Sequence, residues 1–276
     1  MIIRLACAAM GTRFELALAG ESEVELHAIA EEALAEIHDC EQRLSPYRQD
    51  SLLSHVHRCA AKDWVRLDVD SYALFDCSKR ICSESDGVFD PSVAPRDPAR
   101  AQDSGGSMRD VELDPEQTAV LLRKAGLRFD FGAIAKGQAL DLAASVLREA
   151  GIQTAILHGG TSSSLAIGAP EASPGFRIAV PGGATKKLRN QAMALSSVRS
   201  PRDASQEPHL IDPNTGLPPT DANIAMVIGD SAMESDAWAT VLAIRPQLAE
   251  RLPQGMRSEL WKTNPEATCQ AAAENS

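Results

Sequence analysis

The chain has 276 residues, of which 44% are hydrophobic and 24% are charged, a composition typical of a folded globular protein. Its formal net charge is −11, from 38 acidic and 27 basic residues. This balance argues against nucleic acid or anionic lipid as the main partner, because binding to phosphate needs a basic face. No stretch approaches the roughly 20 apolar residues of a membrane span. An acidic protein can still bind an anionic ligand where a metal ion and backbone N–H groups offset the phosphate charge.

The cysteines and the first residues of the chain bear on its compartment. Six cysteines are scattered along the chain without C-x-x-C spacing or a histidine at zinc-finger distance, which argues against a zinc site. Such a pattern favours a reducing compartment over a disulfide framework. The opening Leu5-Ala6-Cys7 is similar to a lipoprotein cleavage site, but the apolar stretch before it is too short for a signal peptide. We therefore expect a cytoplasmic protein, or a periplasmic one if a leader was removed.

The predicted elements alternate between strands and helices. Residues 12–18 alternate as in a half-buried strand, and the apolar residues of 21–44 recur at helical spacing. Pro46 and Asp50 end that helix, and a short helix runs through Val56. The later elements are a helix over 70–85, a surface loop over 95–118, a strand ending at 129–132, a helix over 133–150, a strand–glycine turn–strand over 156–168, strands at 176–180 and 224–228, and a helix over 235–244.

This order of elements has no strict strand–helix–strand rhythm and no internal repeat. It therefore predicts an α+β sandwich of mixed sheet and helices rather than a doubly wound parallel sheet. We expect a single domain over residues 1–260, followed by a polar, alanine-rich and frayed tail over 261–276.

The first candidate for chemistry is the D-x-x-x-T pattern formed by Asp236 and Thr240. Positions i and i+4 of a helix share one face, so the carboxylate and the hydroxyl converge. Hard cations such as Mg²⁺ prefer oxygen ligands of this kind. The same two residues also fit an Asp that favours a helix start and a Thr that bonds to its own backbone.

The second candidate is D-F-G-A-I-A-K-G at 130–137, which predicts a strand, a glycine turn and a helix with Lys136 in its first turn. A cation near a helix N-terminus opposes the helix dipole unless an anion also binds there. This favours a phosphate or ribityl site, although a solvated Lys136 is the alternative. The glycine spacing differs from that of a Walker loop.

Two further segments contain histidine and turn residues. His158-Gly159-Gly160-Thr161 is followed by three serines, and these residues fit either close approach to a phosphate or a plain hairpin turn. His209 precedes the turn Asp212-Pro213-Asn214-Thr215-Gly216, and it is either a base near pH 7 or a strand-end residue.

Taken in order, these segments resemble the ApbE family of FAD:protein FMN transferases over roughly residues 8–250. Each motif is weak alone, but seven in the same order and spacing are hard to obtain by chance. The matching segments are Met10-Gly11-Thr12, 44–51 (LSPYRQDS), 86–93 (DGVFDPSV), 130–141 (DFGAIAKGQALD), Gly159-Gly160, 209–218 (HLIDPNTGLP) and 235–240 (SDAWAT).

The resemblance implies an ApbE-like, T-fold-like α+β fold and Mg²⁺-dependent transfer of the FMN half of FAD onto a Thr or Ser hydroxyl of a target flavoprotein, with release of AMP. It implies metal ligation by Asp236, Thr240 and the Ala133 carbonyl, and deprotonation of the acceptor hydroxyl by His209. The residues that match flavin-nucleotide contacts are Met10, Tyr47, Val88, Phe89, Asp90, Asp130, Lys136 and Ile211.

One departure from the family pattern leaves the activity open. The glycine pair is often followed by Asp in this family, whereas here Thr161 follows and Ser162 to Ser164 come after it. Hydroxyls thus replace a carboxylate, which could alter metal occupancy or binding on the adenine side. Two alternatives to the transferase are an FAD pyrophosphatase that gives FMN and AMP, and a non-catalytic FAD-binding protein.

Overall fold

The computed structural model describes residues 1–92, 106–199, 208, 210–221 and 223–262. A seven-stranded sheet forms its centre, and every strand pairing within it is antiparallel. In spatial order its strands are β1 (Ile2–Ala9), β2 (Thr12–Ala19), β6 (Thr154–Gly159), β7 (Ser163–Ile167), β10 (Ala192–Ser197), β11 (Asn223–Gly229) and β12 (Arg257–Lys262).

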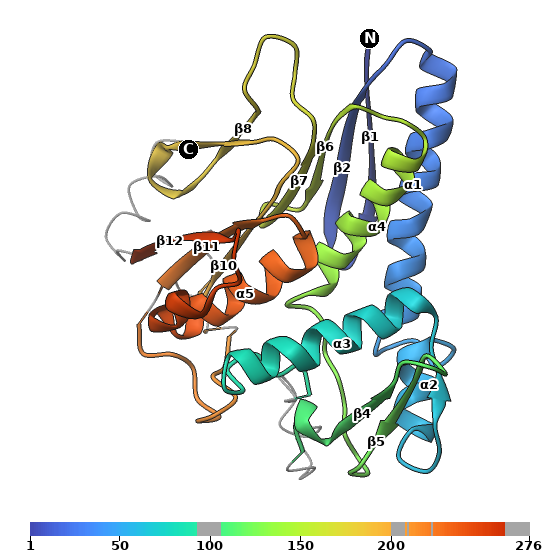
Figure 1. Cartoon of the computed structure of the whole chain (residues 1–276), viewed down its shortest axis with the longest axis vertical. Coiled ribbons are helices and arrows are strands. Elements are labelled where there is room, and N and C mark those ends of the chain that lie inside the picture. The colour runs from blue at the N-terminus through green and yellow to red at the C-terminus, as the bar shows by residue number, and fades with distance from the viewer. Residues whose placement is uncertain (93–105, 200–207, 209, 222, 263–276) are drawn as a thin grey trace, which may run out of the picture.

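Helices α1 (Glu23–Leu44), α4 (Ala135–Glu149) and α5 (Ala232–Ile244) cover one face of this sheet, whereas α2 (Leu52–Cys59) and α3 (Val69–Glu84) lie beside a smaller sheet (Figure 1). A second sheet has the order β3 (Val65–Arg66), β5 (Ala119–Leu122) and β4 (Val111–Asp114), and a hairpin joins β8 (Phe176–Ala179) to β9 (Thr185–Leu188). Three short 3₁₀ helices are η1 (Met108–Asp110), η2 (Pro181–Gly183) and η3 (Pro246–Arg251). The predicted α+β fold is confirmed.

Strands β7, β10 and β11 of the large sheet are covered on both faces. Val227 packs into the main core with the helices, whereas Met226 and Ile228 on either side of it belong to a second core. The β8–β9 hairpin closes that second core with Val180 and Leu188. Strand alternation explains the arrangement, because successive side chains of β11 point to opposite faces.

Helix α5 crosses the middle of the molecule, where it packs on β10 and β11 of the sheet and beside α4. Nearly all of its side chains are buried, including Trp238, so this helix has no solvent-facing stripe. Its N-terminus is capped by Asp141 of α4, whose carboxylate accepts hydrogen bonds from the Ser231 hydroxyl at 2.8 Å and from the backbone N–H groups of Ala232 and Met233 at 2.9 Å. An anion at this position also complements the helix dipole. Asp141 therefore fixes where α5 begins relative to α4.

The helices and several strands lie close to their predicted positions, while two predictions are wrong. No strand ends at 129–132, because residues 127–131 have no regular secondary structure and 132–134 form a turn that leads into α4. Residues 95–118 are not a loop throughout, because Met108–Asp110 forms η1 and Val111–Asp114 forms β4. Burial of Met108 and Val111 against the core stabilises this strand, which is too short for its alternation to stand out among polar neighbours. Strands β1, β3, β5, β9, β10 and β12 are further elements that the sequence patterns do not predict.

The structure also bears on the predictions about membrane spans, cysteines and the C-terminal tail. No described helix combines the length and the apolar composition needed to cross a bilayer. The five cysteines within the described residues are all free thiols. Strand β12 extends to Lys262, and the remainder of the predicted tail, residues 263–276, lies outside the described residues.

His57 of α2 anchors the segment that leads toward Asp130. Its Nε2 accepts a hydrogen bond from the Phe129 backbone N–H at 3.0 Å, and its ring stacks on Phe129 with centroids 5.7 Å apart. Burial, with a smaller contribution from the charges of Arg128 and Arg58, lowers the pKa of His57 from 6.5 to about 4. The imidazole is therefore neutral in the folded protein at pH 7, as an acceptor must be.

Acid should destabilise the fold through this histidine. The unfolded chain binds a proton at His57 below pH 6.5, whereas the folded chain resists it down to about pH 4, so stability is lost as the pH falls through this window. We expect His57→Gln to unfold at a midpoint that changes less between pH 7 and pH 4.5 than that of the wild type. The matched control is His55→Gln on the same helix. Parallel pH curves for wild type and His57→Gln, measured by thermal unfolding, would contradict this role.

Candidate functional site

A cavity of about 610 Å³ lies between α4, α5, the ends of β10 and β11, and the segment after α3. This volume falls in the range of sites for small molecules and cofactors. Nine of the twelve residues predicted for the site line it: Val88, Phe89, Asp90, Asp130, Ala133, Lys136, Ile211, Asp236 and Thr240. Segments that are far apart in the sequence therefore come together at one cavity.

The other three predicted residues stand apart from this group. Met10 lies in the turn between β1 and β2 and packs against the core, and it does not line the cavity. Tyr47 follows α1, is 81% exposed and does not line the cavity either. His209 lies outside the described residues.

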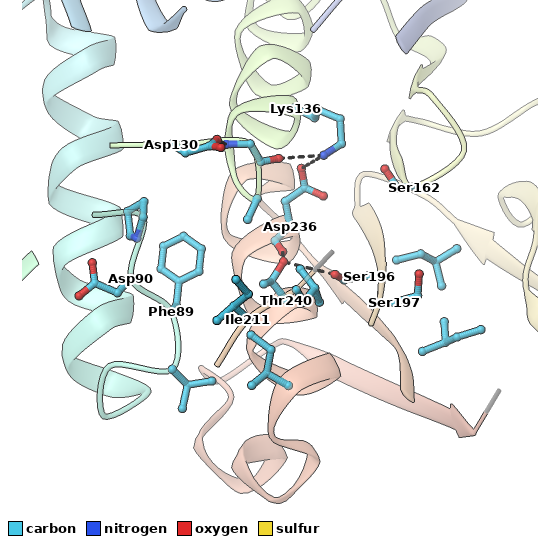
Figure 2. Close-up of a pocket in the computed structure, with 18 of the residues that line it drawn as sticks. Phe89, Asp90, Asp130, Lys136, Ser162, Ser196, Ser197, Ile211, Asp236 and Thr240 are labelled. Atoms are coloured by element: carbon cyan, nitrogen blue, oxygen red, sulfur yellow. Dashed lines mark hydrogen bonds and ion pairs between the residues drawn. The ribbon is translucent and has the colours of Figure 1, made fainter. Parts of the chain in front are cut away.

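Asp236 and Thr240 occupy the middle of α5 and face the cavity together (Figure 2). Asp236 is 5% and Thr240 8% exposed. The Thr240 hydroxyl donates to the Asp236 backbone carbonyl at 3.3 Å and lies 3.4 Å from the Ser196 hydroxyl. The Thr side chain thus does bond to its own helix. Because that bond uses the hydroxyl proton, the oxygen lone pairs stay available to a cation.

The Asp236 carboxylate is held by groups from two other elements. Its Oδ2 accepts from the Gly137 backbone N–H at 2.9 Å, and its Oδ1 accepts from the Ser163 hydroxyl at 2.7 Å. The Lys136 ammonium lies 3.8 Å from Oδ2. A buried carboxylate needs such partners to replace the hydrogen bonds that it loses with water. These contacts also fix its orientation before any ligand arrives.

Lys136 sits in the first turn of α4, where its charge opposes the helix dipole. Its ammonium donates to the Gly132 carbonyl at 3.1 Å and pairs with Asp236. These two contacts compensate the unfavourable position. Lys136 is therefore a positive charge held at the cavity wall, next to the carboxylate, rather than a solvated side chain.

Asp90 and Asp130 lie on two segments of the cavity wall that are hydrogen-bonded to each other. Asp90 accepts from the Ser92 hydroxyl at 2.6 Å and from the Met108 backbone N–H at 3.2 Å. The Asp130 backbone N–H donates to the Pro91 carbonyl at 2.8 Å, and its carboxylate accepts from the Gly132 N–H at 2.8 Å. In Figure 2 Asp90 and Phe89 lie on one side of Asp236, and Ser162, Ser196 and Ser197 lie on the other.

The glycine pair and the serines after it have separate roles. Gly160 has φ +66°, and a Cβ there would meet the Thr12 hydroxyl oxygen at 2.4 Å, so the close approach serves the β6–β7 turn and not a ligand. His158 does not line the cavity and hydrogen-bonds to Ser164 at 2.9 Å, and burial lowers its pKa. Thr161 and Ser162 line the cavity where the family pattern often has a carboxylate.

The sequence patterns alone do not identify three residues that position this site. Ser163 was only one of three consecutive serines, and its bond to Asp236 depends on how β7 packs beside α5. Asp141 and Gly137 lie within the 130–141 motif, but their contacts with α5 depend on helix packing. The i, i+4 spacing of Gly137 and Asp141 places both on one face of α4, and this is the signal that could have suggested a shared partner.

The oxygen atoms at this cavity fit a hard cation. Asp236 offers a carboxylate, Thr240 and Ser196 offer hydroxyls, and Ala133 also lines the wall. Within the described part of the chain no three His, Cys, Asp or Glu side chains cluster as metal ligands. A cation here would therefore bind to few protein oxygens and complete its coordination shell with water and ligand phosphate. Mg²⁺ sites are typically built in this way, whereas Zn²⁺ sites are not.

Comparisons with known proteins identify the same family that the sequence motifs resemble. A model of the ApbE family matches residues 10–257. The chain is 24% identical over 236 residues to a FAD:protein FMN transferase of Klebsiella pneumoniae (strain 342), covering 78% of this chain and 75% of that protein. It is 26% identical over 256 residues to a protein of the same name from Treponema pallidum (strain Nichols), covering 78% and 71%. The crystal structure of the ApbE protein of Thermotoga maritima superposes with a TM-score of 0.80 at 20% identity, covering 97% of this chain and 98% of that one. The ApbE-like fold is thus confirmed.

Proposed function

This chain belongs to the ApbE family, and we propose that it transfers the FMN half of FAD onto a Thr or Ser hydroxyl of a partner flavoprotein, releasing AMP. In this reaction the acceptor oxygen bonds to the FMN phosphorus as the pyrophosphate bond to AMP breaks. The acceptor proton passes to a base, a role for which His209 is the candidate from the family resemblance. The relatives' names, FAD:protein FMN transferase, support this choice of substrate.

The observation that carries the proposal is the pairing of Asp236 with Thr240 on a buried helix face beside Lys136. Asp236, Thr240 and the Ala133 carbonyl would hold Mg²⁺, which offsets the charge that develops on the pyrophosphate oxygens. Lys136 adds a fixed positive charge at the same wall, held by Gly132 and Asp236. The buried position of these groups strengthens their electrostatic effect, since little water screens them.

The apolar wall suits the rings of the ligand. Val88, Phe89 and Ile211 are among the residues that line the cavity. An aromatic ring and branched side chains provide contact area for an isoalloxazine or adenine ring. The cavity therefore offers both charged groups and apolar side chains, as a dinucleotide requires, in which a charged centre joins two flat rings.

A product analysis tests this function. The protein is incubated with FAD and Mg²⁺, with and without acceptor flavoproteins, and the products are identified by mass spectrometry and in-gel flavin fluorescence. We expect a covalent flavin band on an acceptor and AMP in equal amount. FMN and AMP in the absence of an acceptor would instead establish a pyrophosphatase. Bound FAD with no product under any metal would establish a binding protein.

A further inference from the structure

The turn at 210–217 supplies part of the cavity wall and is closed on itself. Asp212 forms a β-bridge with Leu217, and its carbonyl accepts from the Gly216 N–H at 2.8 Å. The Asp212 carboxylate also accepts from the Asn214 N–H at 2.9 Å. The turn is therefore a compact unit, and three of its residues line the cavity: Leu210, Ile211 and Pro213.

Arg245 attaches this turn to the end of α5. It is the C-cap residue of that helix, and its Nε and Nη2 donate to Asp212 Oδ2 at 3.1 Å and 2.9 Å. The Asp212 side chain is 11% and the Arg245 side chain 31% exposed. The same helix carries Asp236 and Thr240. Helix α5 thus connects the residues at the candidate metal site to the 210–217 turn.

A second and more exposed attachment lies nearby. Arg251 of η3 donates to Asp86 Oδ2 at 2.6 Å and to the Glu84 carbonyl at 3.1 Å, and the Asn214 amide donates to the Asp86 carbonyl at 3.2 Å. The segment after Asp86 carries Val88 and Phe89 to the cavity. The Arg251 and Asp86 side chains are 48% and 61% exposed, so water screens this ion pair.

We propose that Arg245 is a positioning residue for the flavin nucleotide, which it serves by fixing the 210–217 turn to α5 without touching the ligand. The inference rests on the proposed function. A partly buried ion pair with two donors to one carboxylate holds geometry better than an exposed pair, and loss of either partner leaves a charge unmatched. Arg245 should therefore matter far more than Arg251, although both pair with a carboxylate in a segment that lines the cavity.

Hydrogen–deuterium exchange of the ligand-free full-length protein tests the positioning directly. In Arg245→Ala we expect peptides covering 210–217 to exchange at least about tenfold faster, while peptides of α5 around Asp236 keep their protection. Arg251→Ala serves as the matched control and should leave exchange of the turn unchanged. Equal exchange of the turn in Arg245→Ala and wild type would overturn the inference, whatever the protein's activity.

FAD binding then tests whether this position matters for the ligand. By quenching of flavin fluorescence, Arg245→Ala should raise the Kd for FAD about tenfold, Arg245→Lys should raise it less, and Arg251→Ala should raise it by less than about twofold. The Mg²⁺ concentration at half-saturation should stay unchanged, because Asp236 and Thr240 remain in place. A double-mutant cycle with Asp212→Asn should be non-additive.

Each outcome separates the inference from the proposed function. Faster exchange with an unchanged Kd for FAD overturns the role in ligand positioning. Wild-type protein that fails to bind FAD refutes the proposed function and the role of Arg245 in it, while the exchange data still decide whether Arg245 holds the turn. A general loss of stability would appear as faster exchange across α5 as well, and that result also counts against a positioning role.

Discussion

Replacing Asp236 with alanine should lower FAD turnover by about 10²–10³-fold, the range found when a preorganised charge-stabilising group is removed from an enzyme. Asp236 is the carboxylate that Gly137 and Ser163 hold against the cavity. Without it Thr240 offers only a neutral hydroxyl to a cation, and the positive charge of Lys136 loses its partner. Turnover should therefore fall together with the affinity for Mg²⁺.

The measurement is AMP release at a series of Mg²⁺ concentrations, with FAD binding followed separately. Asp236→Asn keeps the side-chain shape, so it separates the missing charge from the missing atoms. Asp230→Ala removes an exposed carboxylate a short way before α5 and provides the matched control. If Asp236→Ala kept the wild-type dependence on Mg²⁺, this residue would not be a metal ligand.

Replacing Gly137 with alanine should destabilise the protein and weaken ligand binding at once. A Cβ on Gly137 would meet the Ala232 carbonyl oxygen at 2.2 Å and the Met233 Cα at 2.7 Å. These are backbone atoms of α5, so no side chain can rotate away and the two helices must separate. We expect a cost at or above the about 1–3 kcal/mol typical of overpacking, which outweighs the ~1 kcal/mol that alanine gains over glycine within a helix.

Separation of α4 from α5 also breaks the hydrogen bond between the Gly137 N–H and Asp236. The affinity for Mg²⁺ should therefore fall in Gly137→Ala along with the unfolding temperature, which changes by about 2–4 °C per kcal/mol in a domain of this size. Gly151→Ala at the other end of α4 is the control, because a Cβ there meets open space and only its φ of +78° is strained. An unfolding temperature and Mg²⁺ affinity equal to wild type in Gly137→Ala would contradict the close packing.

The sequence predicts the helices better than the strands. Helix α1 has apolar residues at helical spacing and a Ser22 cap that accepts from the Glu25 N–H, and both signals are local. Strand β10 (AMALSS) shows no alternation of apolar and polar residues, and β1 coincides with an opening that invites comparison with a signal peptide. Their pairing with β11 and β2 stabilises both strands, and such partners do not show in a local pattern.

The site residues also differ in whether local sequence patterns predict them. The spacing of Asp236 and Thr240 on one helix is local, and a series of motifs gave it weight. The contribution of Ser163 depends on strand order and that of Asp141 on helix packing, neither of which a single sequence shows. The separation of Tyr47 from the cavity has the same origin, since the path of the chain after α1 decides it.

The strand order has a consequence for how the chain folds as it is made. Strand β2 pairs with β1 on one edge and with β6 on the other, where Phe14 faces Gly159. During translation β2 therefore leaves the ribosome with one edge unpaired until more than half of the chain has been synthesised. Contacts of such high sequence separation slow folding and expose strand edges to aggregation. Because α5 follows later still, a nascent chain released early has the first strands but no competent cavity.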